Sequence, residues 1–197
     1  MDFKFGEKMN QVLETIKNRR SVRKFKKEQI KDSELEAILE AAIYAPTALN
    51  EQPWQFTVIQ NKELLDEINT VSKKTLAENP DSMKNLPESL INAMSNPKYN
   101  ILYEAPTLIV VSGNKNAHAA IVDCSAAIQN MLLAAESMNI GSVWLGLVRP
   151  YFTTENVKKL NIPENFEPFY GVAFGYKLIE KSKPAPERKK DVVNYIQ

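Results

Sequence analysis

Residues 107–112 read TLIVVS, and a short polar link separates them from a long apolar stretch at residues 117–139. Four consecutive apolar residues, Leu108 to Val111, are typical of a strand that is buried on both faces. The stretch 117–139 is apolar nearly all round, which predicts a long central helix inside the protein. Gly141 is expected to close this helix. The core is therefore predicted to combine a buried strand with a buried helix.

Helical and strand patterns alternate on both sides of this pair. A capping box formed by Ser33 and Glu36 predicts the start of a helix that Pro46 ends. Further helices are predicted at 7–19, 63–77 and 154–160, and a broken helical or loop region is predicted at 79–99. Strands are predicted at 56–60, 142–146 and 169–176. Because helices and strands alternate without strict pairing, the sequence predicts one α+β or mixed-sheet α/β domain over residues 1–197.

The composition is that of a soluble globular protein, with 44% apolar and 25% charged residues among 197. Residues 1–8 have no apolar core of a signal peptide, and the stretch 117–138 contains Asp123 and Glu136, which argues against a membrane span. The single cysteine, Cys124, excludes an internal disulfide. We therefore expect a cytoplasmic protein that binds no membrane.

Because the sequence has only one histidine and one cysteine, it can form few of the zinc sites and nucleophilic catalytic sites that depend on these residues. A His/Cys zinc site lacks ligands, and any nucleophile–histidine pair would have to use His118. We interpret His118 as a surface or capping residue and Cys124 as a small packed residue. If the protein is an enzyme, its reactive group is therefore expected to come from a cofactor rather than from a side chain or a metal.

Positive charge is concentrated near the N-terminus. Seven of the 25 basic residues lie within residues 17–27 with no acid among them, whereas the other 18 face 24 acidic residues, a balance of about −6. Such a cluster suits a small anion, although a solvated helix end has the same composition. A nucleic-acid binder usually has a higher pI than the value of about 7.7 found here.

Three segments carry polar and glycine residues suited to a cofactor. The first, RRSVRKF at 19–25, offers guanidinium groups, which donate paired hydrogen bonds to phosphate. The second, APTALNEQPWQF at 45–56, is a loop stiffened by prolines, with several hydrogen-bonding side chains. The third, GSVWLG at 141–146, predicts a strand edge where main-chain N–H groups can approach a flat ring. No G-x-G-x-x-G segment follows a strand, so a Rossmann dinucleotide site is not predicted.

The order and spacing of these segments resemble the nitroreductase family of flavoproteins over nearly the whole chain, with residues 62–104 carrying no shared motif. The resemblance implies a central, mostly antiparallel sheet flanked by helices, a homodimer, and an FMN site. The residues implied to bind FMN are Arg19, Arg20, Ser21, Arg23, Pro46, Thr47, Ala48, Asn50, Gln52, Leu145, Gly146 and Arg188.

The resemblance also assigns a role to each group of these residues. Arg19, Ser21 and Arg188 would hold the ribityl chain and phosphate, while Arg20 would contribute through its backbone. Arg23 would lie at the N1/O2 edge of the flavin, where positive charge stabilises the reduced ring. Residues 46–50 would come from the partner subunit, and the backbone N–H groups of residues 145 and 146 would face N5 and O4.

The function implied is transfer of electron pairs from NAD(P)H to small electron-poor molecules such as nitroaromatics or quinones, in a ping-pong sequence. One alternative is another flavin reaction on the same fold, either reductive dehalogenation or flavin cleavage, with residues 62–104 as a lid. A second alternative is a non-enzymatic FMN-binding protein. A third is nucleic-acid binding through residues 17–27, which the pI of about 7.7 disfavours.

Overall fold

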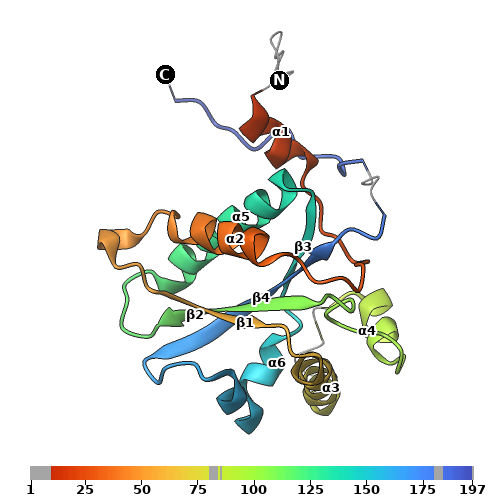
Figure 1. The fold of residues 1–197 in the computed structure, drawn as a ribbon. Coiled ribbons are helices and arrows are strands. Elements are labelled where there is room, and N and C mark those ends of the chain that lie inside the picture. The colour runs from red at the N-terminus through yellow and green to blue at the C-terminus, as the bar shows by residue number, and fades with distance from the viewer. Residues whose placement is uncertain (1–9, 80–83, 85, 180–183, 197) are drawn as a thin grey trace.

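The computed structural model describes residues 10–79, 84, 86–179 and 184–196. Within them, one sheet has the strand order β1-β2-β4-β3, and every neighbouring pair is antiparallel (Figure 1). The strands are β1 (Trp54–Ile59), β2 (Thr107–Asn114), β3 (Ile140–Leu145) and β4 (Phe166–Tyr176). The two central strands, β2 and β4, are therefore paired on both sides, while β3 forms one edge.

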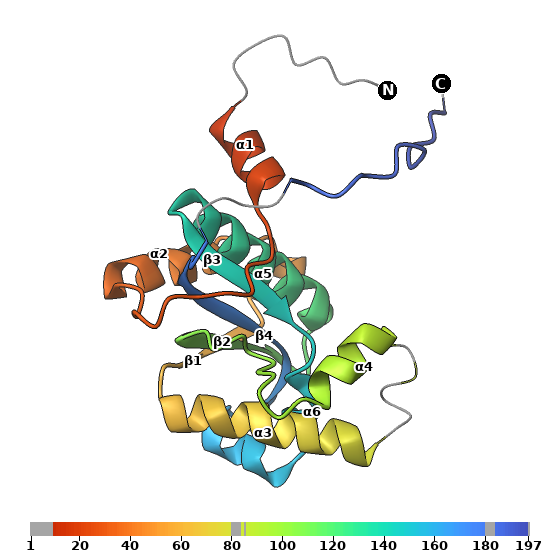
Figure 2. The ribbon, with the colours of Figure 1, turned by 90° about the vertical axis from the view of Figure 1, so that its right-hand side faces the viewer.

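Helices cover both faces of the sheet. Helices α2 (Asp32–Ile43) and α5 (Ala120–Ser137) lie on one face, and α3 (Lys62–Glu78), α4 (Glu88–Met94), α6 (Arg149–Phe152) and the 3-10 helix η3 (Glu155–Leu160) lie on the other (Figures 1 and 2). This arrangement confirms the predicted α+β sandwich with an antiparallel sheet.

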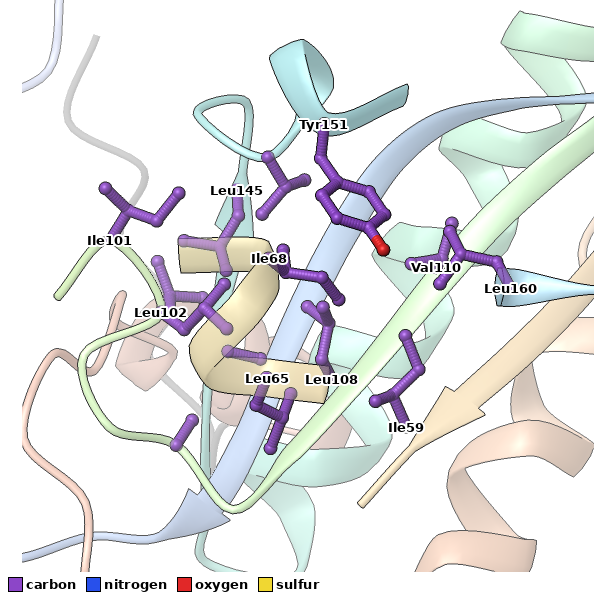
Figure 3. Close-up of a cluster of buried hydrophobic side chains, with 14 of the residues drawn as sticks. Ile59, Leu65, Ile68, Ile101, Leu102, Leu108, Val110, Leu145, Tyr151 and Leu160 are labelled. Carbon is purple, nitrogen blue, oxygen red and sulfur yellow. The ribbon is translucent and has the colours of Figure 1, made fainter. Parts of the chain in front are cut away.

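The alternation of side chains along β2 explains why this strand is apolar throughout. Leu108 and Val110 point into the core under α3, where Figure 3 shows them beside Ile68 and Tyr151. Ile109 and Val111 point to the opposite face and pack in the core under α2 and α5. Successive residues of a strand face opposite sides, so a strand between two helical layers is buried on both faces, as predicted.

Helix α1 (Gln11–Asn18) stands at one end of the molecule, where the chain segment 184–196 passes close to its C-terminal end (Figures 1 and 2). The Asn10 side chain caps it by accepting a hydrogen bond from the Val12 N–H at 2.7 Å. None of its residues is buried, and the side chains of Val12 and Ile16 are 61% and 47% exposed. The predicted apolar stripe is therefore present but uncovered in one chain.

Two predicted helix signals are wrong. Helix α2 begins at Asp32, and the Glu34 carboxylate accepts a hydrogen bond from the Lys31 N–H at 2.9 Å, so Glu34 and not Glu36 completes the first turn. Helix α5 ends at Ser137, and Asn139 adopts the left-handed conformation (φ 57°) expected of Gly141. Asparagine tolerates this conformation, which leaves Gly141 free to pair with Gly175 in the sheet.

The other predicted elements differ from the structure in their limits. Helix α5 begins three residues later than predicted, β3 begins two residues earlier, β4 begins three residues earlier, and the predicted helix at 154–160 is a 3-10 helix. Residues 7–9 of the first predicted helix lie outside the described residues. Helix α6 was not predicted, because four residues around Pro150 give no periodic signal.

Candidate functional site

The basic segment after α1 is fixed to the open edge of the sheet. The Val22 N–H donates to the Ser142 carbonyl at 2.9 Å, and Ser21 forms a parallel bridge with Ser142 of β3. Further along, the Lys26 N–H donates to the Tyr176 carbonyl at 2.9 Å, and Phe25 is buried. The segment thus lies beside β3 at Ser21 and pairs with the end of β4 at Phe25 and Lys26, so its arginine side chains start from a rigid backbone.

Three arginines from the two ends of the chain gather beside the C-terminal end of α5. The pKa of Arg19 is lowered from its ordinary value, first by burial and further by the charges of Arg20 and Arg188, while Glu136 opposes this effect. The charges of Arg20 and Arg188 thus act on the Arg19 guanidinium group. Arg19 and Arg188, two of the residues implied to hold the FMN phosphate, lie near each other, and their binding of FMN stays a prediction.

The nearby carboxylate does not neutralise this cluster. Glu136 accepts a hydrogen bond from the Lys177 ammonium group at 3.0 Å, and only 5% of the Lys177 side chain is exposed. Glu136 is thus shared between a buried lysine and Arg19. Among the described residues, Arg19 and Arg188 thus share the site with one carboxylate that also serves Lys177, and guanidinium groups favour an anionic ligand such as a phosphate.

Arg20 has a further structural role. Its Nη1 donates to the carbonyls of Lys17 and Arg19 at 2.6 and 2.7 Å. These carbonyls close the last turn of α1, where a positive charge is favourable. The Arg20 side chain therefore holds the end of the helix, which agrees with a contribution to a ligand site through its backbone.

Arg23 lies against an aromatic pair rather than in this cluster. Its guanidinium carbon is 5.8 Å from the ring centroid of Tyr103, and the hydroxyls of Tyr99 and Tyr103 are 3.3 Å apart. Burial, with the Tyr103 hydroxyl next, raises the pKa of Tyr99 to about 12. Sequence reasoning missed both tyrosines, because they fall in the region 62–104, which carries no motif.

The loop at residues 46–52 has a constrained backbone. Leu49, Asn50 and Gln52 all have positive φ angles, between 45° and 56°, which is uncommon for residues other than glycine. The Gln52 N–H donates to the Thr47 hydroxyl at 3.2 Å, and the Gln52 amide donates to Asn50 Oδ1 at 3.0 Å. Pro46, Asn50 and Gln52 are exposed. The loop therefore presents polar groups to its surroundings in a defined shape.

Two tethers hold this loop to the beginning of α5. The Ala48 N–H donates to Asp123 Oδ2 at 3.1 Å, and the Asp123 carboxylate is buried. Glu51 accepts a hydrogen bond from the His118 N–H at 2.9 Å and lies 2.7 Å from its ring Nδ1. His118 is a surface residue, as predicted. Cys124 is packed, as predicted, and burial raises the pKa of its thiol to about 12.

The end of β3 offers an open main-chain edge. The Leu145 side chain is buried in the core (Figure 3), so only the main chain of this residue could reach a ligand. Gly146 is exposed, and a Cβ atom added to it would meet no atom within 4 Å. Four residues of extended strand separate Gly146 from Ser142, about 13 Å at 3.3 Å per residue. An elongated ligand with a charged end and a flat end could span this edge.

One chain does not bring all the predicted residues together. The arginine cluster lies at Glu136, near the C-terminal end of α5, whereas residues 46–52 are tethered to Asp123 near its N-terminal end. The 13 residues between these two acids span about 20 Å at 1.5 Å per residue. Each chain therefore carries two parts of the predicted site at opposite ends of one helix.

These features define an α+β protein with arginine side chains beside one edge of its sheet, and the comparisons with known proteins give its family. The sequence profile of the nitroreductase family matches residues 16–176. The chain belongs to the nitroreductase family. Among the described residues, no helix has the length and apolar character needed to cross a membrane.

Several relatives share most of their length with this chain. A protein of Archaeoglobus fulgidus, provisionally named an NADH dehydrogenase/NAD(P)H nitroreductase, is 38% identical over 88% of this chain and 89% of its own. A nitroreductase from Bacteroides fragilis, solved with bound FMN, has a TM-score of 0.79 and 34% identity over 96% of this chain and 100% of its own. An iodotyrosine deiodinase of Thermotoga neapolitana is 31% identical over 95% of this chain and 98% of its own.

Proposed function

We propose that this protein is an FMN-dependent oxidoreductase, which uses NAD(P)H to reduce small electron-poor molecules such as nitroaromatics or quinones. The observation that carries the proposal is the segment 19–25, which is hydrogen-bonded to β3 and places Arg19 near Arg188, with the main chain at Gly146 open at the end of the same strand. Relatives named as NAD(P)H nitroreductases and a nitroreductase with bound FMN support it. We propose a cytoplasmic location, because a buried cysteine without a disulfide is ordinary in the cytosol. We also propose that residues 1–197 form one domain.

The residues at the site fit FMN. Arg19, Ser21 and Arg188 would hold its single phosphate and ribityl chain, because Arg19 and Arg188 lie close enough for their charges to interact and guanidinium groups donate paired hydrogen bonds to phosphate. The main chain at Leu145 and Gly146 would face the ring, because nothing fills the space beside Gly146. Arg23 would add a positive charge at the ring edge.

When bound, FMN supplies the chemistry, because it can accept an electron pair from one partner and pass it to another. The side chains bind and orient, and no described residue needs to act as a nucleophile. His118 is engaged with Glu51 on the surface, and the Cys124 thiol is buried. The protein thus contributes position and electrostatics.

Purified protein is expected to release FMN, and not FAD, on denaturation, and the bound flavin is expected to lose its colour when NADPH or NADH is added without oxygen. Absorption spectroscopy with chromatography of the released flavin measures both. FAD, or failure to bind any flavin on reconstitution, would contradict the proposal. A flavin that stays coloured with either donor would indicate a non-enzymatic FMN-binding protein.

Reductive dehalogenation is a second candidate function, because the relative from Thermotoga neapolitana is named an iodotyrosine deiodinase. The same electron pair could serve either reaction, so the substrate distinguishes them. A steady-state screen of oxidants that contains nitroaromatics, quinones and iodinated phenols separates the two, with iodide release as the readout for dehalogenation.

We also propose that two chains form a homodimer in which residues 46–50 of one chain cover the flavin held by Arg19, Ser21 and Arg23 of the other. Support comes from the two parts of the site, which lie about 20 Å apart along α5 and would meet if two α5 helices ran antiparallel across a twofold axis. Exposed apolar side chains on α1 and at the start of α5, among them Val12, Ile16 and Val122, provide surface for the contact.

Removing FMN is expected to weaken this dimer, because a ligand that binds only the assembled state stabilises that state by mass action. Sedimentation of holoprotein and apoprotein at low micromolar concentration measures the change. A monomer that retains its flavin and full reductase activity would contradict both the shared site and the placement of residues 46–50.

A further inference from the structure

The segment that carries Tyr103 is fixed firmly to α3. The Lys73 ammonium group donates to the carbonyls of Asn96 and Tyr99, both at 2.9 Å. The Ile101 N–H donates to Asn69 Oδ1 at 2.9 Å. Ile101 is fully buried, and it is labelled in the core of Figure 3. Tyr103 therefore extends from a rigid support.

The backbone at Tyr103 is strained. Tyr103 and Glu104 have φ angles of 57° and 56°, so two successive residues other than glycine adopt the left-handed conformation. Such conformations are unfavourable and persist where the surroundings impose them, which happens often at functional sites. The anchored neighbours Ile101 and Leu102, both buried, provide that constraint here.

The strained tyrosine supports Arg23, which is otherwise exposed. The guanidinium carbon of Arg23 is 5.8 Å from the Tyr103 ring centroid, within the range of a cation–π contact. Tyr99 meets the Tyr103 ring edge-on, with centroids 6.1 Å apart and an interplanar angle of 86°. Within the described part of the chain, no carboxylate lies within ion-pair distance of Arg23. The aromatic contact is therefore what orients this long side chain.

We propose that Tyr103 is a positioning residue that holds the Arg23 guanidinium group at the edge of the bound flavin and thereby raises the flavin's reduction potential. The inference rests on the proposed function, because it takes Arg23 to lie beside FMN. A fixed positive charge near the ring favours the electron-rich reduced form. Without the aromatic support, Arg23 would spend more time in solvent, and its effect on the ring would fall. Residues 62–104, which carry no motif shared with the family, would then contribute to the redox properties of the flavin.

The test compares variants of the FMN-loaded protein. Tyr103→Leu removes the ring and is expected to shift the equilibrium between oxidised and reduced flavin about fivefold towards the oxidised form, the size of a moderate cation–π contact. Tyr103→Phe keeps the ring and is expected to retain the wild-type potential. Tyr99→Phe, the matched control, removes the neighbouring hydroxyl without touching Arg23 and should also leave the potential unchanged. Dye-equilibrated spectral titration measures all three.

A second comparison links the effect to Arg23. Arg23→Gln is expected to shift the potential in the same direction, and Tyr103→Leu should add nothing further in the Arg23→Gln background. Tyr103→Met, which keeps a bulky apolar side chain, replaces Tyr103→Leu if the leucine variant does not fold. An unchanged potential in a folded, flavin-loaded variant that lacks the ring would overturn the inference and leave the proposed function intact. Absence of FMN from the wild-type protein would instead overturn the proposed function.

Discussion

The Glu136→Ala variant is expected to lose about 3–5 kcal/mol of unfolding free energy, the usual cost of leaving one charge of a buried pair without its partner. The Lys177 side chain is 5% exposed, and its ammonium group donates to Glu136 at 3.0 Å. Removal of the carboxylate leaves this ammonium group buried without its partner, and it also removes the negative charge that acts on Arg19. Urea denaturation followed by circular dichroism measures the loss.

The double variant Glu136→Leu/Lys177→Met provides the control, because it removes both charges and keeps apolar volume. It is expected to recover most of the lost stability, since replacing a whole buried ion pair by apolar residues is often neutral. A loss below about 1 kcal/mol in the single variant, the range of exposed pairs, would show that water reaches Lys177 and that the pair is not desolvated.

Arg19→Ala is expected to weaken FMN binding by about 1.5–3 kcal/mol, the range of a charged hydrogen bond, which corresponds to roughly a 10- to 150-fold rise in Kd. Arg19 is partly buried, whereas Arg188 is exposed, so solvent screens the charge of Arg19 less than that of Arg188. Titration of apoprotein with FMN, followed by quenching of flavin fluorescence, measures the change.

The matched control for Arg19→Ala is Lys27→Ala, which removes an exposed charge from the same basic run. Its FMN affinity should remain close to that of the wild type at moderate salt, because an exposed charge at a distance is screened. Equal affinity of the Arg19→Ala variant and the wild type, with the fold intact, would assign Arg19 to the solvated surface.

Local patterns were sufficient to predict the main elements. The apolar run 107–112 and the apolar stretch 117–139 identified β2 and α5, because a strand and a helix between two layers must be apolar on most of their surface. The ends of the elements were less accurate. A helix end depends on which of several polar residues meets the free backbone groups, and at α2 Glu34 took the place expected for Glu36.

Contacts between distant residues could not be predicted from patterns. The Ala48–Asp123 hydrogen bond joins residues 75 positions apart, and the Lys177–Glu136 pair joins residues 41 apart. Asp123 and Glu136 were seen only as polar residues in an apolar helix. Tyr103 gave no signal, because its role depends on the path that the chain takes from α3 to β2. The predicted grouping of Arg19, Ser21 and Arg188 came from a resemblance to a family, which brings such long-range placement with it.

The division of the site between the two ends of α5 has a genetic consequence if two chains share each site. A chain that lacks Arg19 and a chain with a damaged loop at 46–52 are each inactive in their own homodimers. In a mixed dimer, one site combines both defects, and the other combines the intact arginine cluster of one chain with the intact loop of the other. Random pairing of the two chains makes about half of the dimers mixed, so two alleles that are null when alone could then restore up to about a quarter of the activity when expressed in the same cell.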